Sequence, residues 1–224
     1  MDGRGRWLLG LGATIVVGLA CHRDVARARA GEAELALPPP HTSGGVALDD
    51  ALARRRSRRT LGGAALTDPE LGQLLWAAQG VTDREQGLRA APSAGALYPL
   101  VVYVVTGAGV QRYEPETHGL SFVARVDRRD ALSKAAHGQT VVGGAPASLV
   151  VVGIVARTRA KYGARAERFV TLEAGHAVQN VLLEATALGL GAVPIGAFDD
   201  DAVRAVVEES ADALPLYVVP LGRS

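Results

Sequence analysis

The sequence predicts an α+β domain over residues 46–224, on three observations. Strand-like apolar runs and helix-like repeats are mixed along the chain without regular β–α–β alternation. The 224 residues are 48% hydrophobic and 21% charged, which is ordinary for a globular protein and excludes a disordered chain. No internal repeat is visible, so the length suits one domain, or at most two small ones, with a sizeable core.

Charge and composition argue against several kinds of partner. The chain carries 24 Lys+Arg against 23 Asp+Glu, a net charge of +1, and only 4% aromatic residues. We therefore expect no nucleic-acid partner, because neither a basic surface nor an aromatic stacking platform is indicated. Cys21 is the single cysteine, which excludes an internal disulfide and a cysteine-based zinc site.

The first residues have the pattern of an export signal. Arg4 and Arg6 precede an apolar run over 7–20, which is shorter than the about 20 residues that span a membrane. Cys21 stands where a bacterial lipobox places its lipidated cysteine. We expect 1–21 to be a signal peptide with a lipobox, and the protein to be exported and anchored by lipidated Cys21, facing the periplasm or the cell exterior. An uncleaved signal anchor with an incidental cysteine is the alternative.

The globular pattern begins after a proline-rich stretch. Residues 22–45 are small, charged and rich in proline, which predicts an extended tether ahead of Val46. Leu48 and Leu52 then stand at helical spacing and predict a helix over 47–56.

Each later element has its own signal. Thr67-Asp68-Pro69-Glu70 is a capping box with proline in the first turn, and it predicts a helix that ends at Gly80. Continuous apolar runs predict buried strands, and apolar residues around most of one long helix predict a central position for it. The expected order is strand 100–106, strand 119–126, helix 130–137, strand 149–156, helix 165–188, helix 199–208 and strand 216–221.

The densest charge in the chain is Arg54-Arg55-Arg56-Ser57-Arg58-Arg59, the arginine box, at the end of the first predicted helix. A phosphate monoester carries about two negative charges and several acceptor oxygens. Arginine forks and a serine hydroxyl match that geometry. A solvated basic face is the alternative, and on composition alone that simpler interpretation is favoured.

Six motifs that follow one another along the chain favour the phosphate site over the basic face. They are the arginine box, Ala91–Pro99 (APSAGALYP), Lys161–Gly163 (KYG), Glu173–Asn180 (EAGHAVQN), Gly189–Asp199 (GLGAVPIGAFD) and Pro220–Arg223 (PLGR). Together they resemble the nitroreductase superfamily, and more narrowly its SagB/ThcOx-type dehydrogenase branch, over about residues 46–224. The resemblance implies an α+β fold with a central, mostly antiparallel sheet flanked by helices, and FMN bound at a homodimer interface.

The resemblance also implies which residues contact FMN. The residues matched to its phosphate and ribityl chain are Arg55, Arg56, Ser57 and Arg59, with a further phosphate contact from Arg223. Those matched to a loop that reaches the flavin of the partner subunit are Pro92, Ser93, Ala94 and Gly95. Those matched to a turn whose backbone lies against the isoalloxazine ring are Pro194, Ile195, Gly196 and Ala197. A plain β-turn and a strand-to-loop bend are the alternatives for the last two segments.

Lys161 and Tyr162 are the candidate catalytic residues. In azoline-oxidising relatives, a Lys-Tyr pair at this place takes part in removing a proton while hydride passes to FMN. A surface Lys-Tyr pair in a charged loop is the alternative. The implied function is an FMN-dependent oxidoreductase that passes hydride equivalents between FMN and a small-molecule or peptide substrate, with NAD(P)H as a candidate partner. A cofactor-free or inactive binding lipoprotein on the same fold is the competing hypothesis.

The Glu173-x-x-His176 motif raises the question of a metal site. A di-iron carboxylate site needs two such motifs, and the sequence holds one. We therefore expect no metal, and we interpret these side chains as buried hydrogen-bonding groups at a dimer helix, with Gln179 or Asn180 near the cofactor.

Overall fold

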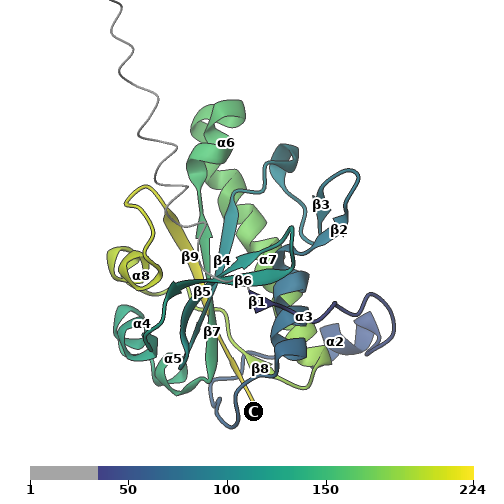
Figure 1. Ribbon diagram of the computed structural model, residues 1–224, viewed down its shortest axis with the longest axis vertical. Helices are drawn as coiled ribbons and strands as arrows, with labels where there is room; N and C mark the ends of the chain where they lie inside the picture. The colour runs from purple at the N-terminus through teal and green to yellow at the C-terminus, as the bar shows by residue number, and fades with distance from the viewer. Residues whose placement is uncertain (1–34) are drawn as a thin grey trace, which may run out of the picture. The chain divides into compact units, whose positions relative to one another are not determined.

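The computed structural model describes residues 35–224, which are built around a seven-stranded sheet (Figure 1). Its strand order is β1-β6-β5-β4-β7-β9-β8, and every neighbouring pair is antiparallel. The strands are β1 (Leu35–Ala36), β4 (Leu100–Thr106), β5 (Gly109–Glu114), β6 (Gly119–Ala124), β7 (Ala147–Gly153), β8 (Gly191–Ala192) and β9 (Leu214–Gly222). β2 (Val81–Asp83) and β3 (Leu88–Arg89) form a separate hairpin.

Helices cover both faces of this sheet. They are α2 (Leu48–Arg54), α3 (Asp68–Gln79), α4 (Arg129–Ala135), α5 (Thr140–Gly144), α6 (Val155–Tyr162), α7 (Ala166–Ala187) and α8 (Asp200–Val207), with short 3-10 helices η1 (Ala94–Ala96) and η2 (Gly163–Arg165). In Figure 1, α3 and α7 lie to one side of the sheet, and α4, α5 and α8 to the other. This is the predicted α+β class, with an antiparallel sheet flanked by helices.

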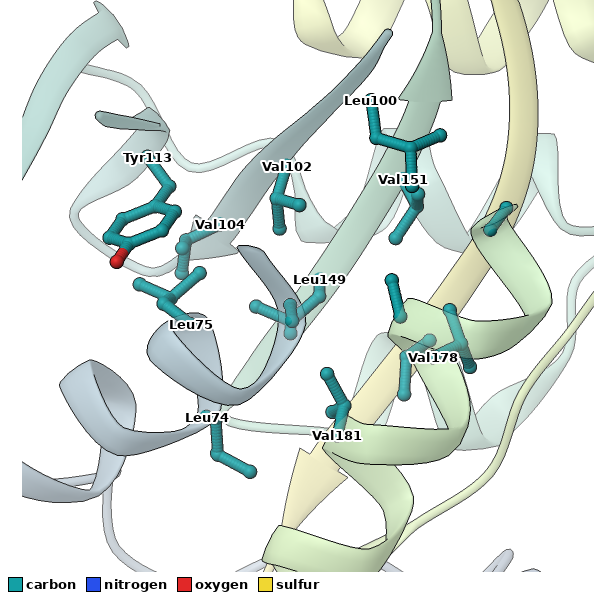
Figure 2. Packing of buried hydrophobic residues seen from close by; sticks show 14 of the residues in the cluster. Leu74, Leu75, Leu100, Val102, Val104, Tyr113, Leu149, Val151, Val178 and Val181 are labelled. Carbon is teal, nitrogen blue, oxygen red and sulfur yellow. The ribbon is translucent and has the colours of Figure 1, made fainter. Parts of the chain in front are cut away.

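Alternate side chains of the central strands enter two cores. Val102 and Val104 of β4 pack on the α3 and α7 side, while Tyr103 and Val105 pack on the α4, α5 and α8 side. Figure 2 shows Leu74 of α3 and residues of α7 turned toward the β4 and β7 side chains on the first face. Because successive strand residues point to opposite faces, a strand covered on both sides has a continuous apolar sequence.

The predicted capping box starts α3. The Thr67 hydroxyl accepts a hydrogen bond from the Glu70 backbone N–H (3.4 Å), and the Glu70 carboxylate accepts one from the Thr67 backbone N–H (2.9 Å). These bonds satisfy two backbone donors that the helix itself leaves free.

The chain leaves the sheet earlier after β7 than the sequence predicts. The expected strand runs to residue 156, but β7 ends at Gly153 and α6 begins at Val155. A Cβ atom on Gly153 would lie 2.4 Å from Cγ1 of Val170, so glycine here lets α7 approach the strand end closely.

Residues 35–41 pack on the domain, ahead of the predicted start at Val46. β1 pairs with β6, and the Leu37 side chain, 7% exposed, lies in the core beneath α3. Beyond it, the His41 backbone N–H donates to Oε1 of Gln73 (2.8 Å), and Nε2 of Gln73 donates back to the His41 carbonyl (3.1 Å). Because residues 22–45 are charged and rich in proline as a whole, their composition does not indicate that this short apolar segment packs on the domain.

Leu37→Ala should lower the free energy of unfolding by about 2 kcal/mol, because it removes a buried side chain and leaves a cavity. Leu35→Ala is the matched control, since Leu35 lies two residues earlier in the same segment but is 45% exposed. Denaturant titration of both variants checks the difference. Equal small losses would show that this segment does not support the core.

The predicted signal peptide, including Cys21, lies outside the described residues, and export and lipidation stay predictions. Within residues 35–224, no helix is both long enough and apolar enough to cross a bilayer.

Candidate functional site

The predicted site residues fall into two groups at opposite ends of the central strands. The register aligns Leu100, Gly153 and Leu214 in one terminal row and Thr106, Ala147 and Leu221 in the other. The 92–98 loop (Pro92–Tyr98) precedes the first row and α6 follows it, while β8 and the chain terminus lie at the second row (Figure 1). Seven residues of strand span roughly 20 Å, so the two groups of one chain lie far apart.

The first group gathers the arginine box and the C-terminus. Ser57 forms a parallel bridge with Ala192 of β8, and the Arg58 N–H donates to the Ala192 carbonyl at 2.9 Å. Gly62 and Arg223 exchange two backbone hydrogen bonds of 3.1 and 3.0 Å. The segment after α2 is thereby pinned beside the end of β9, which brings the arginine box to Arg223 across about 165 residues of sequence.

The guanidiniums of the arginine box are available to a ligand. Arg55 is half-buried, and Arg56, Ser57 and Arg59 are exposed. Nη1 of Arg56 turns back to the carbonyls of Ala53 (3.0 Å) and Arg55 (2.7 Å), at the end of α2 where carbonyl groups carry partial negative charge. Within residues 35–224, no side chain of the box forms an ion pair with an acid.

Arg223 has a protein partner. Its Nη1 and Nη2 atoms donate to the two carboxylate oxygens of Glu70, at 2.7 and 2.9 Å. This guanidinium is the main cause that holds the pKa of Glu70 below its usual range. Glu70 therefore both caps α3 and holds the arginine that the sequence assigns to phosphate. The sequence gives the capping role of Glu70 but no signal for its partner.

The predicted turn over 194–197 runs along the edge of β9. The Ile195 N–H donates to the Val218 carbonyl (2.8 Å), and the Ile195 carbonyl accepts from the Val218 N–H (2.9 Å), so both backbone groups of this buried residue are bonded to the sheet. Pro194 is half-buried, whereas Gly196 and Ala197 are exposed, and a Cβ atom on Gly196 would meet nothing within 4 Å. Gly196 and Ala197 are thus the part of the turn that a flat ligand can approach.

The second group brings the 92–98 loop onto the candidate catalytic pair. A Cβ atom on Gly95 would lie 2.8 Å from Nζ of Lys161 and 3.0 Å from Oη of Tyr162. A side chain at this position would require these groups to shift, and the φ of 65° is one that glycine adopts freely. Lys161 is exposed, while the half-buried Tyr162 ring packs edge-to-face on Phe169, with ring centroids 4.8 Å apart.

Tyr98 anchors the far end of this loop. Its N–H donates to Oγ of Ser93 (2.9 Å), its hydroxyl accepts from the Arg89 backbone N–H (3.1 Å), and its carbonyl accepts from Nη1 of Arg157 (3.3 Å). Ala96 and Tyr98 adopt positive φ angles of 54° and 44°, which are unfavourable for non-glycine residues. The loop is thus strained and held by the Arg89 backbone of β3 and the Arg157 side chain of α6, which the sequence did not reveal.

The EAGHAVQN segment lies within α7, and its side chains separate. Glu173 is 3% exposed, whereas His176 and Gln179 are exposed to solvent. Nδ2 of Asn180 donates to the Ala77 carbonyl (3.1 Å), and so ties α7 to α3. Among residues 35–224, no group of three or more potential ligands is placed to hold a metal ion.

The first group fits the phosphate and ring of FMN. Exposed arginines without acidic partners and the Ser57 hydroxyl are suitable phosphate donors. The open backbone at Gly196 and the exposed Ala197 are suited to a flat ring system. The second group supplies an amine and a phenol beside an exposed glycine, which are groups that can transfer protons.

Solved structures of the same fold cover most of the chain. One, described as a "putative nitroreductase" from Ralstonia eutropha, is 29% identical, has a TM-score of 0.79 and covers 97% of this chain and 96% of its own. The NADPH:FMN oxidoreductase from Vibrio harveyi complexed with NAD⁺ has a TM-score of 0.59 over 79% of this chain and 68% of its own. At 21% identity, the second shows a common fold alone.

Comparison by sequence also matches this chain to nitroreductases. The chain is 41% identical over 184 residues to the "Putative nitroreductase MJ1384" of Methanocaldococcus jannaschii, covering 80% of this chain and 91% of that protein. The family model described as "Nitroreductase family" matches residues 52–223, which include both groups of the site. The chain belongs to the nitroreductase family.

Proposed function

We propose that this protein is an FMN-dependent oxidoreductase of the SagB/ThcOx type, which passes hydride equivalents between bound FMN and a small-molecule or peptide substrate. The observation that carries the proposal is the convergence of the arginine box and Arg223 at the end of β9, the strand whose edge the 194–197 turn follows. Family membership supports a flavin-dependent oxidoreductase in general. The Lys161–Tyr162 pair against the APSAG segment supports the narrower type.

In this proposal, the first group holds the cofactor. Ser57, Arg59 and Arg223 bind the phosphate, Arg55 and Arg56 extend the site toward the ribityl chain, and Gly196 and Ala197 support the ring. FMN, when bound, supplies the hydride acceptor or donor. The chain contributes binding, orientation and the exclusion of competing reactions.

The separation of the two groups supports a homodimer. In this proposal, the phosphate lies at the arginine box, at the opposite end of the sheet from Gly95 of the same chain, and a second chain in the opposite orientation supplies its own Gly95 to the cofactor. Exposed apolar side chains are available for such an interface, namely Leu48 (63% exposed) and Leu52 (50%) on α2 and Leu172 (52%) on α7. In the dimer, Lys161 and Tyr162 then act beside the partner's cofactor.

Two classes of substrate suit the same site. An amine and a phenol beside the loop suit removal of a proton from a peptide-borne heterocycle during its oxidation. The NADPH:FMN oxidoreductase of Vibrio harveyi, whose structure is a complex with NAD⁺, supports a nicotinamide partner instead.

A cofactor-free binding protein is the second candidate. The observation in its favour is the bidentate Glu70–Arg223 pair, because Glu70 neutralises an arginine assigned to phosphate. The full arginine box and the open Gly196 favour the cofactor-binding proposal over it.

FMN binding separates the two candidates. We expect the full chain, purified with added FMN, to be yellow and dimeric, and to release FMN on denaturation. Size-exclusion chromatography with absorbance detection measures both properties. A colourless dimer that takes up no FMN would support the binding protein.

A further inference from the structure

Glu173 on α7 is a buried carboxyl group without a hydrogen-bond partner. Its side chain is 3% exposed, and neither Oε1 nor Oε2 has a partner among the described residues. A buried polar group without a partner is costly, and native proteins keep few of them. The group therefore needs an explanation beyond packing.

The surroundings of Glu173 connect it to the 92–98 loop. The Ser93 hydroxyl and the Ala94 backbone lie near the carboxyl without completing a hydrogen bond, and they lower its pKa. The positive charge of Arg89 on β3 lowers it as well. Burial is the largest effect, and it raises the pKa of Glu173 to about 7. The next titratable side chain along α7, His176, is exposed to solvent.

The loop transmits any movement at Ser93 to the catalytic pair. The Ser93 hydroxyl accepts a hydrogen bond from the Tyr98 backbone N–H, which ties the two ends of the loop together. Gly95, two residues further along, is packed against the Lys161 amine and the Tyr162 hydroxyl of α6. The strained Ala96 and Tyr98 leave the loop few alternative conformations.

We propose that Glu173 is a positioning residue, whose carboxyl sets the place of the 92–98 loop and, through Gly95, the place of Lys161 and Tyr162. This inference rests on the proposed function only for its consequence in catalysis. The neutral carboxyl tolerates burial under the closed loop. The carboxylate favours an open loop that admits water.

The direction of the pH effect follows from linkage. In the closed loop Glu173 has a pKa of about 7, against the ordinary 4.5 when exposed. Opening therefore releases a proton between these two values, and it becomes roughly tenfold more favourable for each unit of pH in that window. Below the window, the carboxyl is neutral in both states. Above it, the carboxyl is ionised in both states, so the equilibrium constant for opening stays at its highest value and no longer changes with pH.

Hydrogen exchange of the full chain without added FMN tests this inference. The protection factors of the 93–98 amides, corrected for intrinsic exchange, should fall by roughly tenfold per unit between about pH 5 and 7 and then level off. In Glu173→Gln, which stays neutral, protection should remain high and independent of pH. Glu184→Gln is the matched control: Glu184 is another acid of α7 whose pKa is raised by burial, but it is half-buried and lies beside Gln73 and His41.

Three outcomes would overturn the proposal. They are flat protection in the unaltered chain, the same pH slope in Glu173→Gln, and loss of the slope in Glu184→Gln. If Glu173→Gln does not fold, infrared spectroscopy of the unaltered chain decides: the band of a protonated carboxylic acid should persist to about pH 7, and its loss by pH 5 refutes the proposal.

The FMN-loaded chain separates this inference from the proposed function. If FMN does not bind but the loop shows the expected pH slope, the proposed function fails and the positioning role of Glu173 stands. If FMN binds and protection is flat, only the role of Glu173 fails. In the loaded protein, the rate of flavin reduction should lose part of its pH dependence in Glu173→Gln.

Discussion

Arg59→Ala and Arg223→Ala should each weaken FMN binding roughly 10- to 150-fold, and the double variant should lose the cofactor during gel filtration. Hydrogen bonds between guanidinium and phosphate are charge-assisted and contribute about 1.5–3 kcal/mol, and 1.4 kcal/mol is about tenfold in Kd. Both side chains lie at the surface, so the loss should fall on the cofactor and not on the fold. Quenching of FMN fluorescence on titration with protein gives the Kd values.

Two further variants control for charge. Arg54→Ala removes the same charge from the same box, but Arg54 donates to the Asp50 carbonyl (3.3 Å) and is assigned no contact with FMN. Its Kd should match that of the unaltered chain. Glu70→Gln removes the anion that faces Arg223, so FMN should bind equally well or more tightly. If Arg54→Ala weakened FMN binding as much as Arg59→Ala, the box would be a general basic surface and not a phosphate site.

Much of the fold could be predicted because burial leaves a direct signal in sequence. β4 occupies the predicted residues 100–106, since both of its faces are covered by helices. β5 was missed because it carries Arg112 and Glu114 on its less buried face and follows β4 across a very short turn. α6 was missed because its sequence, VARTRAKY, is mostly polar and directly follows a strand.

The sequence names candidate residues for the site but not their arrangement. The motifs named Gly95 and Lys161 separately, and nothing local indicates that glycine leaves the space that the lysine amine fills. Helical spacing places Glu173 and His176 on neighbouring positions of one face, yet only Glu173 is buried, because the 92–98 loop lies against it. The Glu70–Arg223 pair joins positions 153 apart, which only the folded chain brings together.

Lys161→Ala and Tyr162→Phe should lower the rate of azoline oxidation by roughly 10²- to 10⁴-fold, the range expected when a general acid or base is removed. Both groups lie at Gly95, away from the arginine box, so the Kd for FMN should not change. Anaerobic bleaching of the bound flavin measures the rate, with azoline peptides, NADH and NADPH compared as donors. Arg159→Ala is the matched control, because it removes an exposed basic side chain from the same helix.

The pattern across donors distinguishes the two substrate classes. Oxidation of an azoline requires a C–H proton to leave as hydride passes to the flavin, so it depends on the amine and the phenol. Reduction of the flavin by NADH or NADPH transfers hydride alone, and it should keep its rate in both variants. Bleaching by azoline that survives in both variants would contradict a catalytic role for the pair. Loss of bleaching by every donor would instead indicate that these side chains hold the 92–98 loop in place.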